Sequence, residues 1–187
     1  MVIQWLRSNK YASGLLLLLR LYVGWEWITA GWHKLTAGFD ASGYLNNAVA
    51  KPVIDSATKE LVYPNYVSFL KQFALPHVNW FNTLIPLGEF LVGLGLIIGV
   101  LTTAAAFFGL LMNFMFMFAG TVSVNPWLMM FGVIIFVSGA NAGKFGGDYY
   151  VLPLIRKVFQ SLRATTFGTH RPGNSHSYKH GADTPSL

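Results

Sequence analysis

Residues 14–35 (GLLLLLRLYVGWEWITAGWHKL) form an apolar run that is long enough to cross a lipid bilayer, yet the run contains Arg20 and Glu26. About 20 mainly apolar residues span the hydrocarbon core as a helix. A charged side chain at that depth costs about 2.5 kcal/mol or more, so it needs a partner or a function. We therefore expect the rest of the chain to supply helices that cover these two charges.

The composition indicates an integral membrane protein. Of the 187 residues, 53% are apolar and 11% are charged, whereas a soluble domain has about 25% charged residues. The chain contains no cysteine, which excludes disulfides, Cys-ligated zinc and iron–sulfur clusters. The net charge of +6 lies mostly in the flanks and tail, where it favours contact with anionic lipid over nucleic-acid binding.

Four apolar segments predict a single domain of residues 1–163 that is an all-α, four-transmembrane-helix bundle. The predicted spans are residues 14–35, 80–101, 104–120 and 127–141. Arg20 interrupts the first apolar run too early for a signal peptide, so we expect a retained helix there. A tight turn at Thr102 and Thr103 is predicted between the second and third spans.

The polar segments also show helical patterns. The long connection between the first two spans contains residues 66–73, whose apolar face predicts a short helix that lies on the membrane or over the mouth of the bundle. After the fourth span, residues 154–163 predict a basic amphipathic helix suited to an anionic leaflet. Residues 164–187 predict a disordered polar tail. Basic residues at both ends place the N- and C-termini in the cytoplasm and the long connection outside.

The polar residues of the predicted spans lie at similar depth. One stripe of the first span, at near-multiples of the helical period, holds Arg20, Gly24, Trp27, Gly31 and Lys34. Glu26 lies on another face, while Glu89 and Asn113 lie near the middle of the second and third spans. Two interpretations stay open: a buried Arg20–Glu89 ion pair that fixes helix register, or a cavity for a small polar or amphipathic molecule with a protonatable carboxyl.

Several less specific sequence features each allow a functional and a purely structural interpretation. His33 and Lys34, at the outer end of the first span, predict either an anion or headgroup contact or a snorkelling lysine beside an interfacial histidine. The glycine pair Gly95 and Gly99 predicts either a dimer seam or packing within one chain. The tail histidines and the methionines predict no metal site.

Several motifs, taken in order, resemble the DoxX family of small four-helix bacterial and archaeal membrane proteins, which is related to the membrane subunit of thiosulfate:quinone oxidoreductase. The motifs are Arg20, 27–35 (WITAGWHKL), 38–43 (GFDASG), 86–96 (PLGEFLVGLGL), 113–120 (NFMFMFAG), 141–144 (NAGK) and Gly147-Asp148 before Leu152-Pro153. The resemblance implies a multi-pass protein of the bacterial or archaeal cytoplasmic membrane with a quinone-linked redox or respiratory role.

The leading hypothesis combines this resemblance with the polar residues. Arg20, Glu26 and Glu89 are the candidate catalytic residues; Arg20, Trp27, Asn113 and Glu89 are the candidate quinone-binding residues. His33 and Lys34 form the outer anion contact. A thiosulfate activity implies a partner subunit, and a homo-oligomer is the other assembly considered.

Two further functions are weighed against this hypothesis. The first is a non-enzymatic accessory or assembly subunit of a larger respiratory or oxidase complex, packed through its glycine-lined helix faces. The second, ranked last because inverted repeats and broken helices are not evident, is a small-solute transporter.

Overall fold

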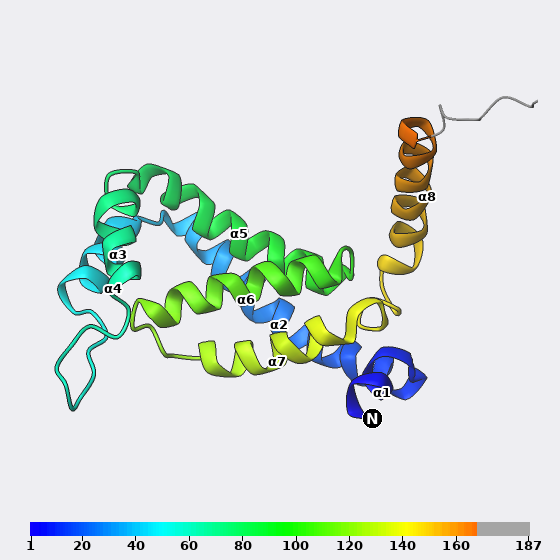
Figure 1. Ribbon diagram of the computed structural model, residues 1–187, viewed down its shortest axis with the longest axis horizontal. Helices are drawn as coiled ribbons and strands as arrows, with labels where there is room; N and C mark the ends of the chain where they lie inside the picture. Colours follow the sequence, from blue (N-terminus) through cyan, green and yellow to red (C-terminus); the bar gives the residue numbers. More distant parts are fainter. Residues whose placement is uncertain (168–187) are drawn as a thin grey trace, which may run out of the picture. The chain divides into compact units, whose positions relative to one another are not determined.

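The computed structural model describes residues 1–167, and these confirm the all-α prediction, with one isolated β-bridge between Ile54 and Leu61. The helices are α1 (Val2–Ser8), α2 (Lys10–Ala37), α3 (Ala41–Ala50), α4 (Pro64–Phe69), α5 (Val78–Ile98), α6 (Thr102–Phe118), α7 (Asn125–Ser138) and α8 (Asp148–Phe167). A π-helix, η1 (Leu70–Ala74), follows α4, and a 3-10 turn, η2 (Gly139–Asn141), follows α7. The four predicted spans overlap helices α2, α5, α6 and α7 (Figure 1), and the last three predicted spans run two or three residues past the ends of their helices.

Within the described residues, α5 alone is both long enough and apolar enough to cross a bilayer, while α6 and α7 are apolar but shorter. Helix α2 is the longest, at 28 residues, but it carries Arg20, Glu26 and Lys34. Helix α2 is long enough to cross a bilayer, but its charged residues make it less apolar than α5.

The chain divides into two compact units at Leu152 and Pro153, inside α8. The predicted amphipathic helix at 154–163 belongs to α8, and residues 164–167, the first four of the predicted tail, continue that helix. The rest of the predicted tail lies outside the described residues.

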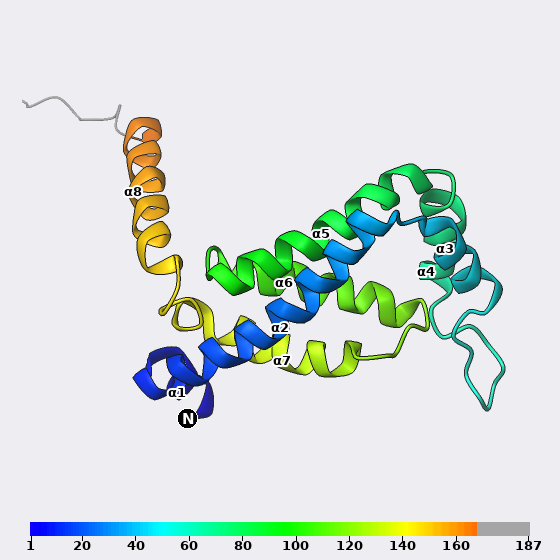
Figure 2. The same cartoon turned by 180° about the vertical axis from the view of Figure 1, so that it is seen from behind.

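Helices α2 and α5 run antiparallel in close contact, as Figure 2 shows. Glycines allow this approach: a Cβ atom on Gly93 of α5 would lie 2.6 Å from Ile28 Cα of α2, and one on Gly24 would lie 3.1 Å from the Gly93 carbonyl oxygen. The small residues of the predicted α2 stripe therefore pack against another helix of the same chain, as close helix contacts in lipid require.

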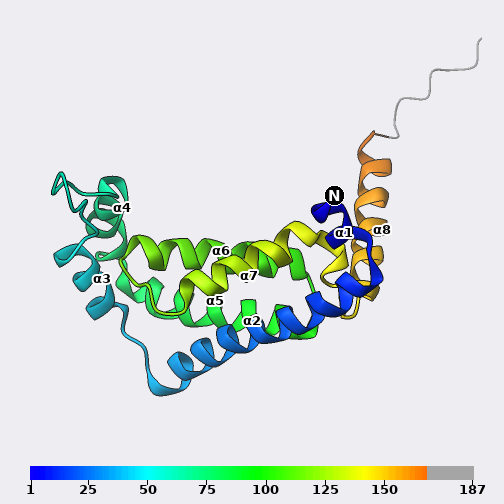
Figure 3. The same ribbon diagram turned by 90° about the horizontal axis from the view of Figure 1, so that it is seen from below.

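Two clusters of buried residues fill the first unit. The larger cluster joins α2, α5, α6 and α7, and includes Val23, Trp27, Leu96 and Ile135. In the smaller one, α3 packs on η1 at one end of the four long helices (Figure 3). The long connection, residues 38–77, is thus partly helical and covers that end.

The turn between α5 and α6 lies at residues 99–101, so the predicted turn at Thr102 and Thr103 is wrong. Gly99 ends α5 in the left-handed conformation, with φ 72°, which glycine adopts without steric cost. The Asp148 carboxylate accepts hydrogen bonds from the backbone N–H groups of Leu101 (2.6 Å) and Thr102 (3.0 Å). Because these groups are satisfied, α6 begins at Thr102.

Candidate functional site

A cavity of about 290 Å³ lies among α2, α3, α5, α6 and the start of α7, and we call it the polar chamber. Its polar lining residues are Glu26, Lys34, Tyr44, Glu89, Thr121, Ser123 and Asn125. Its apolar lining residues are Trp27, Ala30, Phe39, Ile85, Phe116, Val124 and Leu128. The volume is close to the lower end of ordinary ligand pockets, about 300–1,000 Å³.

An ion pair between Lys34 and Glu89 forms one wall of the polar chamber. The Lys34 Nζ atom lies 2.6 Å from both carboxylate oxygens of Glu89. The Glu89 side chain is 2% exposed and the Lys34 side chain 28%. The pair forms because Gly31, one turn before Lys34, lets α2 approach the backbone of Phe90 beside Glu89.

This pairing differs from one of the two interpretations of the sequence. The Arg20–Glu89 ion pair is absent from the described residues, since Lys34 binds both oxygens of that carboxylate. Lys34 lines the polar chamber, whereas His33 is exposed and does not line it, and the outer anion contact of these two residues stays a prediction.

Glu26 lines the same chamber without a partner. The residue is half-buried, and within residues 1–167 no hydrogen bond or ion pair reaches its carboxylate. The chamber therefore holds two carboxyl groups and one ammonium group, an excess of acidic groups. Such an arrangement suits a ligand that accepts a hydrogen bond from lysine and exchanges a proton with a carboxyl group.

Arg20 lies outside the polar chamber, 14 positions before Lys34 on α2, about 21 Å along the helix axis. Its side chain is 1% exposed, and it donates hydrogen bonds of 3.2 Å to the carbonyl oxygens of Ala142 and Phe145. The Asp148 carboxylate contributes an opposite charge nearby. The guanidinium therefore fastens α2 to the glycine-rich segment after α7, a structural contact far from Glu89.

Asn113 is also separated from the chamber. It is buried and lines a cavity of about 10 Å³ together with Trp27. Trp27 lines both cavities and stacks on Phe116, with ring centroids 6.4 Å apart. Of the residues predicted for the site, the structure thus brings Glu26, Trp27, Lys34 and Glu89 together and leaves Arg20, Asn113 and His33 apart.

Tyr44, which is not among the residues predicted from the sequence, lies on α3 and lines the polar chamber. Asp40 caps α3 by accepting from Ser42 N (2.9 Å) and Ser42 Oγ (2.6 Å), while Asn82 of α5 accepts from Ala41 N (2.7 Å). Asp40 before a short helix is an N-cap signal in the sequence. The Tyr44 hydroxyl is buried, and within the described part of the chain it has no hydrogen-bond partner.

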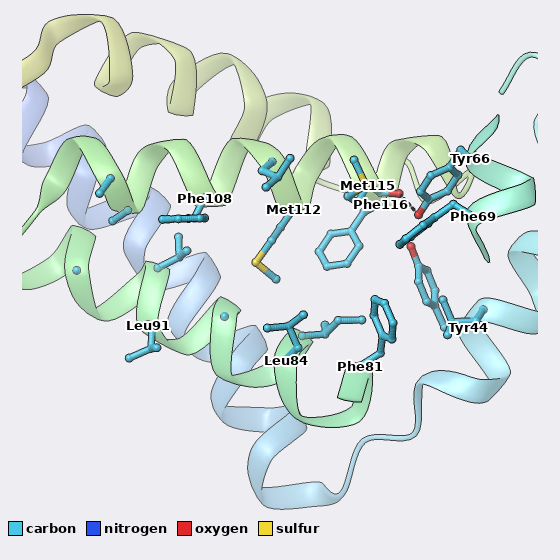
Figure 4. Close-up of a pocket in the computed structure, with 18 of the residues that line it drawn as sticks. Tyr44, Tyr66, Phe69, Phe81, Leu84, Leu91, Phe108, Met112, Met115 and Phe116 are labelled. Carbon is cyan, nitrogen blue, oxygen red and sulfur yellow. Dashed lines mark hydrogen bonds between the residues drawn. The ribbon is translucent and has the colours of Figure 1, made fainter. Parts of the chain in front are cut away.

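A second cavity, of about 590 Å³, adjoins the first, and we call it the apolar groove. It lies between α5 and α6, with α3 and α4 at one end (Figure 4). Tyr44, Ile85 and Phe116 line both cavities. The polar chamber and the apolar groove are therefore neighbours that share these three side chains as a common wall.

The described residues contain one helix that is long and apolar enough to cross a bilayer, and the bundle buries the charged side chains of Arg20 and Glu89, features that are compatible with a helical membrane protein. A family model described as DoxX matches residues 15–124, and the chain belongs to the DoxX family. The matched range contains every residue that lines the polar chamber except Asn125 and Leu128. Comparison with curated proteins and with solved structures gave no match.

Proposed function

We propose that α2, α5, α6 and α7 all cross the cytoplasmic membrane of a bacterium or archaeon, with both termini in the cytoplasm. The burial of Arg20 and Glu89 supports α2 and α5 as neighbours in lipid, because a charge facing hydrocarbon is costly. Helix α6 has 17 residues, the short end of the range of about 17–25 residues for a spanning helix. Basic residues before α2 and after α7 support the orientation.

Within this membrane protein, we propose that the polar chamber binds the ring of a quinone and that the protein takes part in quinone-linked redox chemistry. The observation that carries the proposal is a partly open chamber close to ligand size, with an ammonium fixed by Glu89 and an unpaired carboxyl, beside a larger apolar groove. Quinone carbonyl oxygens accept hydrogen bonds, and the reduced form donates them, so both forms find complementary groups.

Each charged residue of the chamber has a separate role in this proposal. A bound quinone supplies reversible two-electron, two-proton chemistry. Lys34 donates a hydrogen bond to the ring, and Glu89 holds the ammonium in place. Glu26 has no internal partner and is therefore the group that takes up or delivers a proton. Electrons arrive from a partner subunit or a larger membrane complex, in line with the resemblance to thiosulfate:quinone oxidoreductase.

The test is quinone binding to the purified protein in lipid nanodiscs, followed by tryptophan fluorescence, since Trp27 lines the chamber. A tailless quinone should quench saturably, and Glu26→Gln should weaken binding of the reduced form about tenfold, equivalent to about 1.4 kcal/mol. Glu60→Gln is the matched control, because Glu60 is exposed in the outer connection.

Linear quenching that is identical in all three proteins would contradict the proposal, because it reports partitioning into lipid. That result would favour the accessory-subunit function instead, and purification of the native complex would then identify the partner.

A further inference from the structure

We infer that the ligand carries a long hydrocarbon tail, that the tail lies in the apolar groove, and that the Tyr44 hydroxyl binds the ligand where ring and tail meet. This inference rests on the proposed function for the position of the ring. It adds the substrate class, a lipid-tailed quinone, and a positioning residue, Tyr44.

The lining of the apolar groove suits a flexible hydrocarbon chain. Figure 4 shows Leu84 and Leu91 of α5 facing Phe108 and Met112 of α6 across the space. Methionine side chains adapt to irregular apolar partners. Gly88 of α5 keeps the groove wide, since a Cβ atom there would lie 3.1 Å from the Met112 sulfur. The groove volume is about twice that of the polar chamber.

The polar chamber and the apolar groove together suit an amphipathic ligand, which has a polar ring and an apolar tail. Tyr44, Ile85 and Phe116 line both cavities, so a ligand that occupies the polar chamber and the groove together has to lie against these three side chains and displace part of the wall they form. The charges of the chamber select among tailed molecules. A phospholipid would bring a phosphate beside the carboxyl groups of Glu26 and Glu89, whereas a neutral ring that hydrogen-bonds avoids that repulsion.

Tyr44 is the polar group at this junction that lacks a partner. In Figure 4 the hydroxyls of Tyr44 and Tyr66 lie at the same end of the groove, and Tyr66 donates to the Met115 carbonyl oxygen (2.8 Å). Among the described residues no contact of the buried Tyr44 hydroxyl meets hydrogen-bond geometry, although the hydroxyls of Tyr66 and Thr121 are close enough to influence its pKa. A ligand acceptor at this position would complete a hydrogen bond that these two hydroxyls do not form. Burial, with the neighbouring Tyr66 phenol, raises the pKa of Tyr44, so its hydroxyl stays a donor at neutral pH.

Photo-crosslinking tests where the tail lies. A quinone analogue with a diazirine on its tail is bound to the full-length protein in nanodiscs, irradiated, and the adducts are mapped by mass spectrometry. We expect adducts on groove residues of α5 and α6, suppressed by excess untagged long-tailed quinone. Adducts spread over lipid-facing positions such as Leu18 and Val133, without suppression, would overturn the inference. So would equal groove labelling by a diazirine phospholipid that the quinone does not displace.

Two variants sharpen the result. Gly88→Leu fills the groove and should reduce groove adducts at least fivefold relative to the unmodified protein. Gly14→Leu, where a Cβ atom meets nothing within 4 Å, is the matched control. Equal adduct yields in the two variants would overturn the tail position.

Tyr44→Phe removes only the hydroxyl. We expect quinone affinity to fall about tenfold, with the melting temperature of the ligand-free protein unchanged or slightly raised, because a buried hydroxyl without a well-formed hydrogen bond adds no stability. A lower melting temperature with normal affinity would assign Tyr44 a structural role and overturn the inference.

Failure of the inference can be distinguished from failure of the proposed function. If tailless quinone fails to bind the unmodified protein, the proposed function itself fails. If tailless quinone binds but the groove stays unlabelled, the tail position alone fails.

Discussion

At the residue scale, Lys34 is the main difference between the predicted and the observed site. The sequence places Arg20 and Lys34 on the same stripe of α2, and both are near-multiples of the helical period from Trp27. Periodicity predicts which residues share a face of a helix, but it does not predict the axial register between two helices. The residue that pairs with Glu89 depends on the register of α2 against α5. That register is set by glycine contacts that a single sequence does not reveal.

The Lys34–Glu89 pair makes a stability prediction. Lys34→Met leaves the buried Glu89 carboxyl without its counter-charge, and we expect a loss of about 3 kcal/mol, the low end for a broken buried pair because Lys34 is partly exposed. The double variant Lys34→Met/Glu89→Leu should recover most of this loss. Unfolding in detergent measures both, and equal losses in the single and double variants would contradict a direct pair.

Asp40 makes a pH prediction at the same scale. The hydrogen bonds from Ser42 lower the pKa of Asp40 below its ordinary value. The cap therefore stabilises α3 fully above the ordinary aspartate pKa of about 3.9, and the contribution is lost as the pH falls through the lowered value. Asp40→Ala should lower the melting temperature at pH 6, and this difference should shrink as the pH approaches 3. A difference that stays constant down to pH 3 would exclude the carboxylate cap.

At the element scale, apolar runs predicted the long helices well, because burial in lipid or in a core selects the same residues. Helix α3 was missed because it has only ten residues, several of them small, and because the helix is held by contacts distant in sequence, with Asn82 and with η1. Tyr44 was lost with it. The turn at Gly99 was misplaced by three residues because its partner, Asp148, is distant in sequence.

The α2–α5 contact can be tested with the same substitution, glycine to alanine, at two positions of α2, for which we expect changes of opposite sign in the free energy of unfolding. Gly31→Ala should destabilise the protein by about 1–3 kcal/mol, because its Cβ atom would lie 2.8 Å from the Pro86 carbonyl oxygen. Gly14→Ala should stabilise it by about 0.5–1 kcal/mol, because the same helix gains a better helix former in open space. Unfolding curves decide, and a stabilising Gly31→Ala would contradict the close contact.

At the scale of the whole first unit, Arg20 and Asp148 connect three distant parts of the chain: α2, the start of α6, and the segment after α7. From the sequence, Arg20 was correctly predicted to be a buried charge that needs partners. It was assigned to ligand binding, whereas its partners in the structure are backbone carbonyl oxygens. Backbone carbonyls of a glycine-rich segment cannot be recognised as partners from composition, because every residue carries one.

This connection predicts a change in backbone dynamics that is separate from ligand binding. Asp148→Ala removes the acceptor of two backbone N–H groups, so hydrogen exchange at Leu101 and Thr102 should accelerate at least tenfold. Tailless quinone affinity should stay within twofold of the unmodified protein. Mass spectrometry of exchanged peptides covering residues 99–102 measures the first effect, with Asp55→Ala as an exposed control. Unchanged exchange in Asp148→Ala would show that the carboxylate does not hold the turn.

Helix α2 is uninterrupted from Lys10 to Ala37, with the chamber lysine near one end and Arg20 nearer the other. A rigid rod fixed at two points cannot rotate about its axis at one of them alone. A rotation of the whole helix that moves Lys34 away from Glu89 would also move the Arg20 guanidinium relative to the carbonyl oxygens of Ala142 and Phe145. The wall of the chamber and the segment that leads into α8 are therefore attached to one and the same continuous helix.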